Sequence, residues 1–481
     1  MHRTKLVFTV GPAVDDDEKL RALIRAGMSV ARVNFSHGDH ATHAAYIERL
    51  RRLAAEENAV VAILGDLQGP KLRVGTIAGG AVNLQPDQAI TLTLRDVPGS
   101  AREVNLPHPE LVREVKTGQR LLLDDGQLEF VVTSVTDTDL NCRVITGGPL
   151  GSHKGVSAPG ANLSLSALTE KDRVDIGFAV EQRVDFLALS FARTGKDVCE
   201  LRDVLAGYHA DIPIVTKIEQ VEALENFEDI LSCSDAIMIA RGDLGVETPP
   251  ESVPVAQKRL IRLCNARGVP VITATQMLQS MLTAPRPTRA EASDVANAIY
   301  DGTDAVMLSG ETASGQYPVE AAQMMARIAA ITEPSIPHEK WLPSRLADRR
   351  GSVEAIGLAT VEIAEEVDAK AIITSTLSGQ TARLVAQFNR ELVPEGRLEE
   401  FLFGVERVSL AAVQGDLREL QDGRCFYCER ALGARCEVDH FVPWVRTPDN
   451  GIENLVAVDR GCNGAKRDHL AAAEHVDAWV R

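Results

Sequence analysis

The chain has 481 residues, 45% of them hydrophobic, which suffices for sizeable cores and, at roughly 150 residues per domain, suggests about three domains. Lys and Arg total 51 against 68 Asp and Glu, and the resulting net charge of −17 excludes a general binder of polyanions. The sequence has neither a run of about 20 apolar residues nor a secretory signal, so we expect a cytoplasmic protein without a membrane partner.

The dominant pattern is a short apolar run followed by an amphipathic helical stretch, such as 15–26 or 252–267. Eight such runs occur, at 5–10, 28–33, 60–65, 184–189, 213–218, 235–240, 269–274 and 304–308. Strands that alternate eight times with helices predict an α/β fold, a (β/α)8 TIM barrel formed by residues 1–71 and 158–335. A doubly wound open sheet is the alternative.

More than one hundred residues separate the third and fourth runs. Residues 72–157 are rich in Gly, Val and Thr and contain short alternating segments such as LEFVVTSV, which predicts an inserted small β-barrel domain. An insertion at this face of a TIM barrel lies beside the active site, so we interpret it as a lid, with a passive decoration as the alternative.

A Pro-containing linker at 333–344 follows the barrel. A helix at 352–367, a strand at 370–375 and a helix at 380–388 then predict a partial αβ domain at 345–388. One strand and two helices cannot bury both faces of a sheet, so we expect this part to depend on its neighbours for stability.

Polar side chains follow seven of the eight predicted strands, where TIM barrels carry their catalytic groups. They are Arg32, Asn34, Ser36 and His37; Asp66, Lys71 and Arg73; Ser190 and Arg193; Lys217 and Glu219; Arg241, Gly242 and Asp243; Thr275; and Ser309 and Glu311. Glu219 and Asp243 could share one Mg²⁺, while Arg32, Arg73 and Lys217 could hold a phosphoryl group. The helix start after Asp243 suits a carboxylate, so we predict a substrate that carries both carboxylate and phosphate.

These strand ends belong to longer distinctive segments within residues 1–388. They include TKLVFTVGPA (4–13), ARVNFSHG (31–38), GDLQGPKLRVG (65–75), TKIEQVE (216–222), ARGDLGVE (240–247) and ITATQMLQSM (272–281). The segments resemble the pyruvate kinase family. The resemblance implies phosphoryl transfer from phosphoenolpyruvate to ADP, giving pyruvate and ATP, with Mg²⁺ or Mn²⁺ as the cofactor.

The resemblance also implies a role for each residue. Arg32 and Arg73 would contact the transferred phosphoryl group and Lys217 would bridge it in the transition state. Glu219 and Asp243 would hold the Mg²⁺, and Thr275 would lie beside the carbon that is protonated. The positions that would bind substrate or nucleotide are Asn34, Ser36, His37, Asp66, Lys71, Lys154, Ser190, Arg241 and Gly242, and the inserted Asp124–Asp125 pair would join them when the lid closes.

Two departures from the family pattern have consequences. Many members have Glu at the position of Lys71 and bind K⁺ against the residues that match Asn34, Ser36 and Asp66. A fixed ammonium group can replace the charge of that ion, so we expect activity that does not require K⁺. Residues 352–388 resemble only the start of the family's C-terminal domain, which leaves effector binding and the family's usual homotetramer open.

The C-terminal segment, 391–481, concentrates the cysteines. Cys425, Cys428 and Cys462, with the carboxylate of Asp459, would suit tetrahedral Zn²⁺, and unliganded thiols are the alternative. The stretch EVDHFVPW (437–444) and the later Asn454 and Cys462-Asn463 resemble the HNH endonuclease family, a ββα-metal fold. That resemblance implies DNA as a partner, a catalytic divalent metal and a general base. Its metal ligands would be Asp439 and Asn463, and its base would be His440, oriented by Asn454.

The two resemblances leave three functions open. The first is a pyruvate kinase, the second is an HNH endonuclease acting through the C-terminal module, and the third is an inactive chimera of the two. The join between the two resemblances falls inside a domain, where natural boundaries are rare.

Overall fold

The computed structural model describes residues 2–161 and 166–336. Beyond these it describes residues 356, 357, 359, 360, 363, 372, 421, 424–428 and 430–432, together with the backbone of two short strands at Glu437–His440 and Leu455–Val458. The chain divides into two compact units, Met1–Arg349 and Arg350–Arg481.

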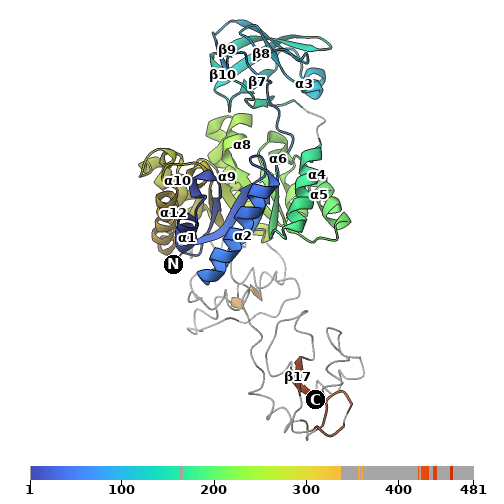
Figure 1. Ribbon diagram of the computed structural model, residues 1–481, viewed down its shortest axis with the longest axis vertical. Helices are drawn as coiled ribbons and strands as arrows, with labels where there is room; N and C mark the ends of the chain where they lie inside the picture. Colours follow the sequence, from blue (N-terminus) through green and yellow to red (C-terminus); the bar gives the residue numbers. More distant parts are fainter. Residues whose placement is uncertain are drawn as a thin grey trace. The chain divides into compact units, whose positions relative to one another are not determined.

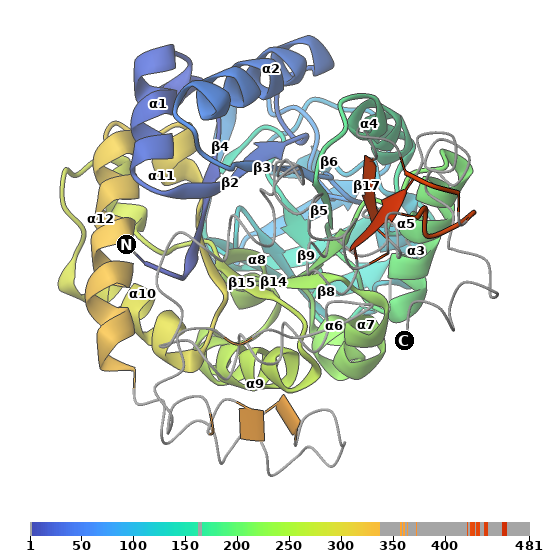
Figure 2. The same cartoon turned by 90° about the horizontal axis from the view of Figure 1, so that it is seen from below.

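Eight parallel strands close into a barrel in the first unit. They are β1 (Lys5–Thr9), β2 (Met28–Asn34), β3 (Ala62–Asp66), β12 (Phe186–Leu189), β13 (Ile214–Ile218), β14 (Ala236–Ala240), β15 (Val271–Ala274) and β16 (Ala305–Leu308). The pairing β1 with β16 completes the ring, and Figure 2 looks into it. The predicted TIM barrel is thus confirmed, and the doubly wound open sheet is excluded because β1 and β16 are hydrogen-bonded to each other.

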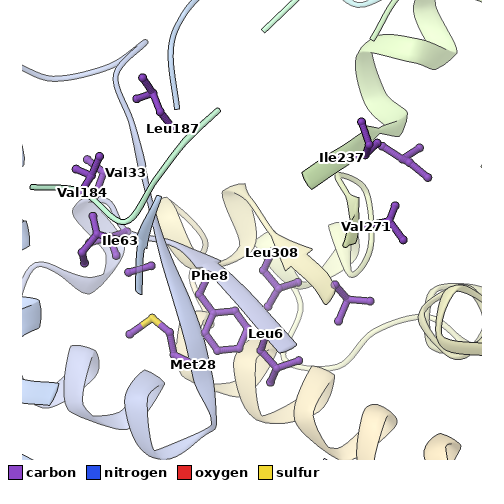
Figure 3. Close-up of a cluster of buried hydrophobic side chains, with 14 of the residues drawn as sticks. Leu6, Phe8, Met28, Val33, Ile63, Val184, Leu187, Ile237, Val271 and Leu308 are labelled. Atoms are coloured by element: carbon purple, nitrogen blue, oxygen red, sulfur yellow. The ribbon is translucent and has the colours of Figure 1, made fainter. Parts of the chain in front are cut away.

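Both faces of the barrel strands are buried. Successive side chains point to opposite faces of a strand, so one set packs against the helices and the other fills the barrel. On β1, Leu6 and Phe8 pack outward against the helices, as Figure 3 shows, whereas Val7 belongs to a separate cluster inside the barrel. On β14, Ile237 faces outward and Met238 faces inward in the same way. This arrangement explains why the strand segments are apolar nearly throughout.

Helices surround the barrel as an outer ring (Figure 2). They are α1 (Asp17–Arg25), α2 (His40–Glu56), α4 (Glu170–Glu181), α5 (Gly195–Gly207), α6 (Val221–Glu225), α7 (Phe227–Cys233), α9 (Val253–Arg267), α10 (Arg289–Asp301), α11 (Gly310–Ala313) and α12 (Pro318–Thr332). The short helix α8 (Arg241–Glu247) lies instead at the end of the barrel that faces the inserted domain (Figure 1). Local sequence sets several of their ends. Thr169 begins α4 and Thr288 begins α10 with reciprocal capping boxes, and Gly302 ends α10 in the left-handed conformation that glycine adopts without strain.

The described residues between β3 and α4 form a separate group of strands with its own hydrophobic core. Its elements are β4 (Ala81–Leu84), β5 (Ala89–Thr93), β6 (Glu103–Asn105), α3 (Pro109–Glu114), β7 (Arg120–Leu123), β8 (Leu128–Val135), β9 (Asp139–Thr146), β10 (Gly148–Gly151) and β11 (Val156–Ser157). The predicted inserted β domain is therefore present (Figure 1). Its six-stranded sheet, in the order β11-β7-β8-β9-β5-β6, is mixed and open, so it forms a half-barrel, with β4 and β10 as a separate pair.

The described part of the second unit contains one antiparallel strand pair, β17 (Glu437–His440) with β18 (Leu455–Val458), whose register places Asp439 opposite Val456. Residues 356, 357, 359, 360 and 363 are helical, within the helix predicted at 352–367. The predicted strand at 370–375 and helix at 380–388 lie outside the described residues, apart from Ile372. Among the described helices, none is long and apolar enough to cross a membrane.

Candidate active site

A buried cluster of alternating charges joins β2, β3 and β13 at the carboxyl end of the barrel. Asp66 closes β3 and is 1% exposed. Its Oδ2 accepts a hydrogen bond of 2.6 Å from Arg32 Nε, and its Oδ1 lies 3.5 Å from Lys217 Nζ. Burial alone would raise the pKa of Asp66, but the nearby Lys217 and Arg32 outweigh it and lower that pKa. The carboxylate therefore stays ionised and holds the two cations in fixed positions.

Lys217 connects this cluster to β12 and to the end of β13. Its Nζ donates to Ser190 Oγ at 2.8 Å and lies 2.8 Å from Glu219 Oε1. Burial lowers the pKa of Lys217, yet the carboxylates of Asp66 and Glu219 more than compensate, so the pKa is raised. Lys217 is consequently a permanent ammonium ion whose side chain is only 12% exposed.

Glu219 is a buried carboxylate whose surroundings favour the binding of a further cation. Burial is the largest cause that raises its pKa, and the charge of Asp243 raises it further, while Lys217 lowers it. Its Oε2 accepts from the backbone N–H of Phe191 at 2.7 Å, whereas the buried Oε1 accepts no well-aligned hydrogen bond. That oxygen still faces the Lys217 ammonium at 2.8 Å, so Lys217 neutralises it in the absence of a metal ion.

A hard divalent cation fits this pair of carboxylates. Mg²⁺ prefers oxygen ligands and usually takes only one or two carboxylates, leaving its other positions to water and substrate. Glu219 and Asp243 are such a pair, and in residues 2–161 and 166–336 no group of three or more acidic, His or Cys side chains gathers into a closed metal cage. The donor set therefore suits Mg²⁺ or Mn²⁺ better than a soft metal.

Thr275 follows β15 in a strained backbone conformation. The φ angle of Thr275 is 66° and that of Gln276 is 55°. Both residues are in the left-handed region, which β-branched residues such as Thr275 rarely adopt. The Thr275 hydroxyl donates to the carbonyl of Ala274 at 2.6 Å and accepts from the backbone N–H of Gly242 at 2.7 Å. The strained turn thus fixes the hydroxyl against the start of α8.

Arg241 holds this turn in place. Its guanidinium is 9% exposed and donates to the carbonyl oxygens of Thr275 at 2.9 Å and Gln276 at 3.3 Å. An ion pair of 2.8 Å with Asp294 of α10 supplies the opposite charge. Arg241 therefore acts on Thr275 through the backbone, and the structure gives this arginine a positioning role.

We expect Arg241→Met to lower the free energy of unfolding by about 3 kcal/mol, chiefly because the carbonyl oxygens of Thr275 and Gln276 lose their buried donor. Urea unfolding followed by circular dichroism measures this. Arg202→Met is the matched control, since Arg202 makes similar contacts, to Asp235 and the carbonyl of Cys233, where its side chain is 41% exposed. Equal losses in the two variants would contradict the assigned role.

Three cations converge near His37, which follows β2. Partial burial is the largest cause that lowers the pKa of His37, and the charges of Arg73, Lys71 and Arg32 add to it. Arg73 itself is anchored by a 2.8 Å hydrogen bond from its guanidinium to the carbonyl of His153. The positive potential predicted for the barrel mouth is therefore present where β2 and β3 end.

A cleft lies between the barrel mouth and the inserted domain and encloses about 90 Å³. Lys71 and Asp125 line it from the insertion side, and Asp243 and Glu247 line it from α8. The hydroxyl of Ser157, in β11, donates to Glu247 Oε1, which ties the two sides together. Burial raises the pKa of Glu247 despite that hydrogen bond. A charged ligand in this cleft would touch both domains.

The remaining predicted positions lie around these groups or outside the described residues. Asn34 Oδ1 accepts from the backbone N–H of Ser36 at 3.1 Å, and Lys154 forms a 2.8 Å ion pair with Asp124. Cys425 is buried and Cys428 half-buried, on either side of a turn, and Asp439 and His440 lie in β17. The predicted ligands and orienting group further on, namely Asn454, Asp459, Cys462 and Asn463, lie outside the described residues.

Sequence reasoning missed several residues of the site. Asp294 was not singled out, although it carries the counter-charge of Arg241, and Phe191, whose φ is 55°, supplies the N–H that binds Glu219. Asp172 is fully buried and accepts from the N–H of Gly69 at 3.1 Å, which fixes the turn after β3. Only Asp172 gave a signal in the sequence, as the fourth residue of a capping box.

The family description "Pyruvate kinase, barrel domain" matches residues 1–322. The chain belongs to the pyruvate kinase family. A second description, "Pyruvate kinase, alpha/beta domain", matches residues 354–394, and "HNH endonuclease" matches residues 425–472. The predicted membership of the pyruvate kinase family is confirmed, and so is the resemblance of the C-terminal segment to HNH endonucleases.

Comparison with individual pyruvate kinases supports this family membership. Pyruvate kinase from Clostridium perfringens is 46% identical over 394 residues, which cover 81% of this chain and 83% of that protein. Pyruvate kinase 2 from Synechocystis sp. is 49% identical over 391 residues, which cover 80% of this chain and 66% of that protein. A solved pyruvate kinase structure from Cryptosporidium parvum has a TM-score of 0.76 at 40% identity and covers 80% of this chain and 81% of that chain.

Proposed function

We propose that this chain transfers a phosphoryl group from phosphoenolpyruvate to ADP at the carboxyl end of the barrel. The buried cluster of Arg32, Asp66, Lys217 and Glu219 is the observation that carries the proposal. It presents two fixed cations beside the buried carboxylate of Glu219, whose Oε1 lies against the Lys217 ammonium and accepts no well-aligned hydrogen bond. Such a set binds a phosphate through the cations and a divalent metal through the carboxylate.

Each residue has a chemical task in this proposal. Lys217 and Arg32 hold the phosphoryl oxygens and neutralise the charge that spreads over them during transfer, with Arg73 approaching from the insertion side. Glu219 and Asp243 would hold Mg²⁺ or Mn²⁺, which supplies a Lewis acid for the phosphate and carboxylate oxygens. Thr275, held by Arg241 and Gly242, would lie beside the substrate carbon that is protonated.

The remaining assignments concern the nucleotide and the lid. His37, Lys154 and the Asp124–Asp125 pair would approach ADP, and Asn34, Ser36 and Ser190 would complete the substrate site. Support comes from the cleft, which Asp125 of the inserted domain and Asp243 of the barrel line together. We also propose that the inserted domain, residues 72–157, acts as a lid. The same cleft supports this role, because a ligand in it would draw the two sides together.

A coupled assay of pyruvate formation tests the proposal. Purified protein is expected to form pyruvate only when phosphoenolpyruvate, ADP and Mg²⁺ are all present, and its mass in solution should be recorded in the same preparation. That mass also answers whether the chain forms the family's homotetramer or a smaller assembly. Pyruvate formation that continues without ADP would point to a phosphatase and contradict the proposed transfer.

We expect activity without K⁺. Lys71 lines the cleft, and its ammonium group contributes to the positive potential at His37. This fixed cation supplies the positive charge that K⁺ would otherwise provide. Rates in K⁺-free buffer and in KCl are expected to agree within about twofold, with tetramethylammonium chloride keeping the ionic strength constant. In the Lys71→Glu variant, the same comparison should show a strong activation by K⁺. A wild-type protein that requires K⁺ would contradict this prediction.

A second activity, metal-dependent DNA cleavage, has separate support. The match of residues 425–472 to "HNH endonuclease" and the β17–β18 pair, which carries Asp439 and His440, favour it. In this proposal His440 is the general base that activates water, Asn454 orients His440, and Asp439 and Asn463 would hold a divalent metal. Cys425, Cys428, Asp459 and Cys462 would hold a structural Zn²⁺.

The His440→Ala variant tests the nuclease. We expect wild-type protein to nick supercoiled plasmid DNA in the presence of Mg²⁺ or Mn²⁺, and we expect the variant to lose at least about 99% of that rate, because general-base catalysis contributes at least 10²-fold. Lys217→Met is the control, since it should nick DNA at the wild-type rate. Nicking that persists in His440→Ala would show that this module is not its source.

A further inference from the structure

Two cysteines on neighbouring helices of the barrel's outer ring have their sulfur atoms in contact. Cys199 lies in α5 and Cys233 is the last residue of α7, and their Sγ atoms are 3.8 Å apart. Figure 2 shows the two helices on the outside of the barrel, away from the strand ends inside the ring. Cys199 is exposed and Cys233 half-buried, so a small reagent in solution can reach the pair.

The helices that carry this pair are held together on both sides of it. Asp229 of α7 accepts a 2.8 Å hydrogen bond from the N–H of Gly195, the first residue of α5. Arg202 of α5 donates at 2.8 Å to the carbonyl oxygen of Cys233 itself. These contacts keep the two sulfur atoms opposite each other. The two sulfur atoms of a disulfide are about 2.05 Å apart. Side-chain rotations that move each Sγ atom by roughly 1 Å would bring the two to that distance.

We propose that Cys199 and Cys233 are a redox modification site that forms a reversible intramolecular disulfide with low-molecular-weight disulfides. The Cys233 thiolate attacks one sulfur of the small disulfide, which forms a mixed disulfide and releases one small thiol. Cys199 then loses its proton to solvent and attacks Cys233 Sγ, which releases the second small thiol. The protein loses two protons and two electrons, and the small disulfide gains both as it becomes two small thiols.

The direction of the thiol hydrogen bond assigns these two roles. Cys199 donates its S–H to Cys233, and this hydrogen bond is the largest cause that raises the pKa of Cys199. Because Cys199 is the donor and its pKa is raised, we assign Cys233 as the attacking group and Cys199 as the resolving group. The two other cysteines of the first unit differ. Burial raises the pKa of Cys142 to about 12 and also raises that of Cys264, which makes both unreactive.

A metal site is a poorer use of this pair. A thiolate-bound zinc ion needs three or four protein ligands. Within residues 2–161 and 166–336, no third Cys, His or acidic side chain joins Cys199 and Cys233 in such a group. The pair therefore fits two-electron oxidation better than coordination.

Peptide mapping of the full-length protein tests the site. Native protein is treated with excess oxidised glutathione, alkylated with iodoacetamide and digested with trypsin without reduction. We expect residues 197–202 linked to residues 218–241 in one product that is lighter than the two reduced peptides by about 2 Da and disappears on reduction. The product should be absent from Cys199→Ser and Cys233→Ser and should persist in Cys142→Ser. Alkylation of both cysteines in the treated wild type, or two stable mixed disulfides, would overturn the proposal.

The thermal midpoint of unfolding tests independently whether the disulfide fits the folded protein. The link would close a loop between residues 34 apart in sequence that includes all of β13, so the oxidised protein should unfold about 5 °C higher than the reduced protein. Cys199→Ser should show no shift on oxidation. A midpoint that is unchanged or lower in the oxidised wild type would mean that the disulfide does not fit the folded barrel, which contradicts the geometry argued above.

Discussion

Replacing Lys217 by methionine is expected to lower kcat for pyruvate formation by about 10³-fold or more, because fixed cations at a transferring phosphoryl group contribute effects of this size. The Lys217 ammonium lies within 2.8 Å of Ser190 Oγ and Glu219 Oε1 and within 3.5 Å of Asp66. It is held in place before substrate binds, so its charge is available to the transition state without reorganisation. KM for phosphoenolpyruvate should change much less than kcat.

Lys217→Arg separates this effect from a loss of folding. Methionine leaves Asp66 and Glu219 buried with one neighbouring cation fewer, which will also destabilise the barrel. Arginine keeps the charge, so it should preserve the thermal midpoint better, although its longer planar group will not reproduce the ammonium position and kcat should still fall. A folded Lys217→Met protein with near wild-type kcat would end the proposal that this residue acts in the transfer.

Replacing Glu219 by glutamine is the second change with a large expected effect. The amide keeps an oxygen that can accept from the N–H of Phe191 but removes the charge beside Asp243. We expect the Mg²⁺ concentration for half-maximal activity to rise at least about tenfold and kcat/KM to fall about 10²-fold. Titration of the coupled assay with MgCl₂ measures both values.

A binding measurement tests the same carboxylate without relying on activity. Mg²⁺ that binds only the folded protein should raise the thermal midpoint of the wild type and should raise it much less in Glu219→Gln. Glu200→Gln is the matched control, since Glu200 pairs with Arg173 on the outside of the barrel and lines no part of the cleft. Equal Mg²⁺-induced shifts in the wild type and Glu219→Gln would show that the ion binds elsewhere.

The strand segments and their polar ends could be predicted from sequence for a physical reason. Parallel strands buried on both faces must be apolar throughout, and the loops that follow them all emerge at the same end of the barrel. Arg32, Asp66, Lys217, Glu219 and Thr275 were therefore expected at one mouth. The open sheet of the insertion was not predicted, because alternating residues specify a half-buried strand but not whether its sheet closes.

The sequence by itself determined the family, the order of the elements and the end of the barrel that carries charge, since these depend on periodicity and on local motifs. Only the tertiary structure decided which charges pair. Asn34 lies opposite Asp66 in the strand register, yet it is the side chain of Arg32 that binds Asp66. The ion pair between Asp294 and Arg241 and the contact of Cys199 with Cys233 likewise join residues far apart in sequence. Such pairs depend on the stagger of the closed barrel and on the packing of its outer helices, which no local pattern encodes.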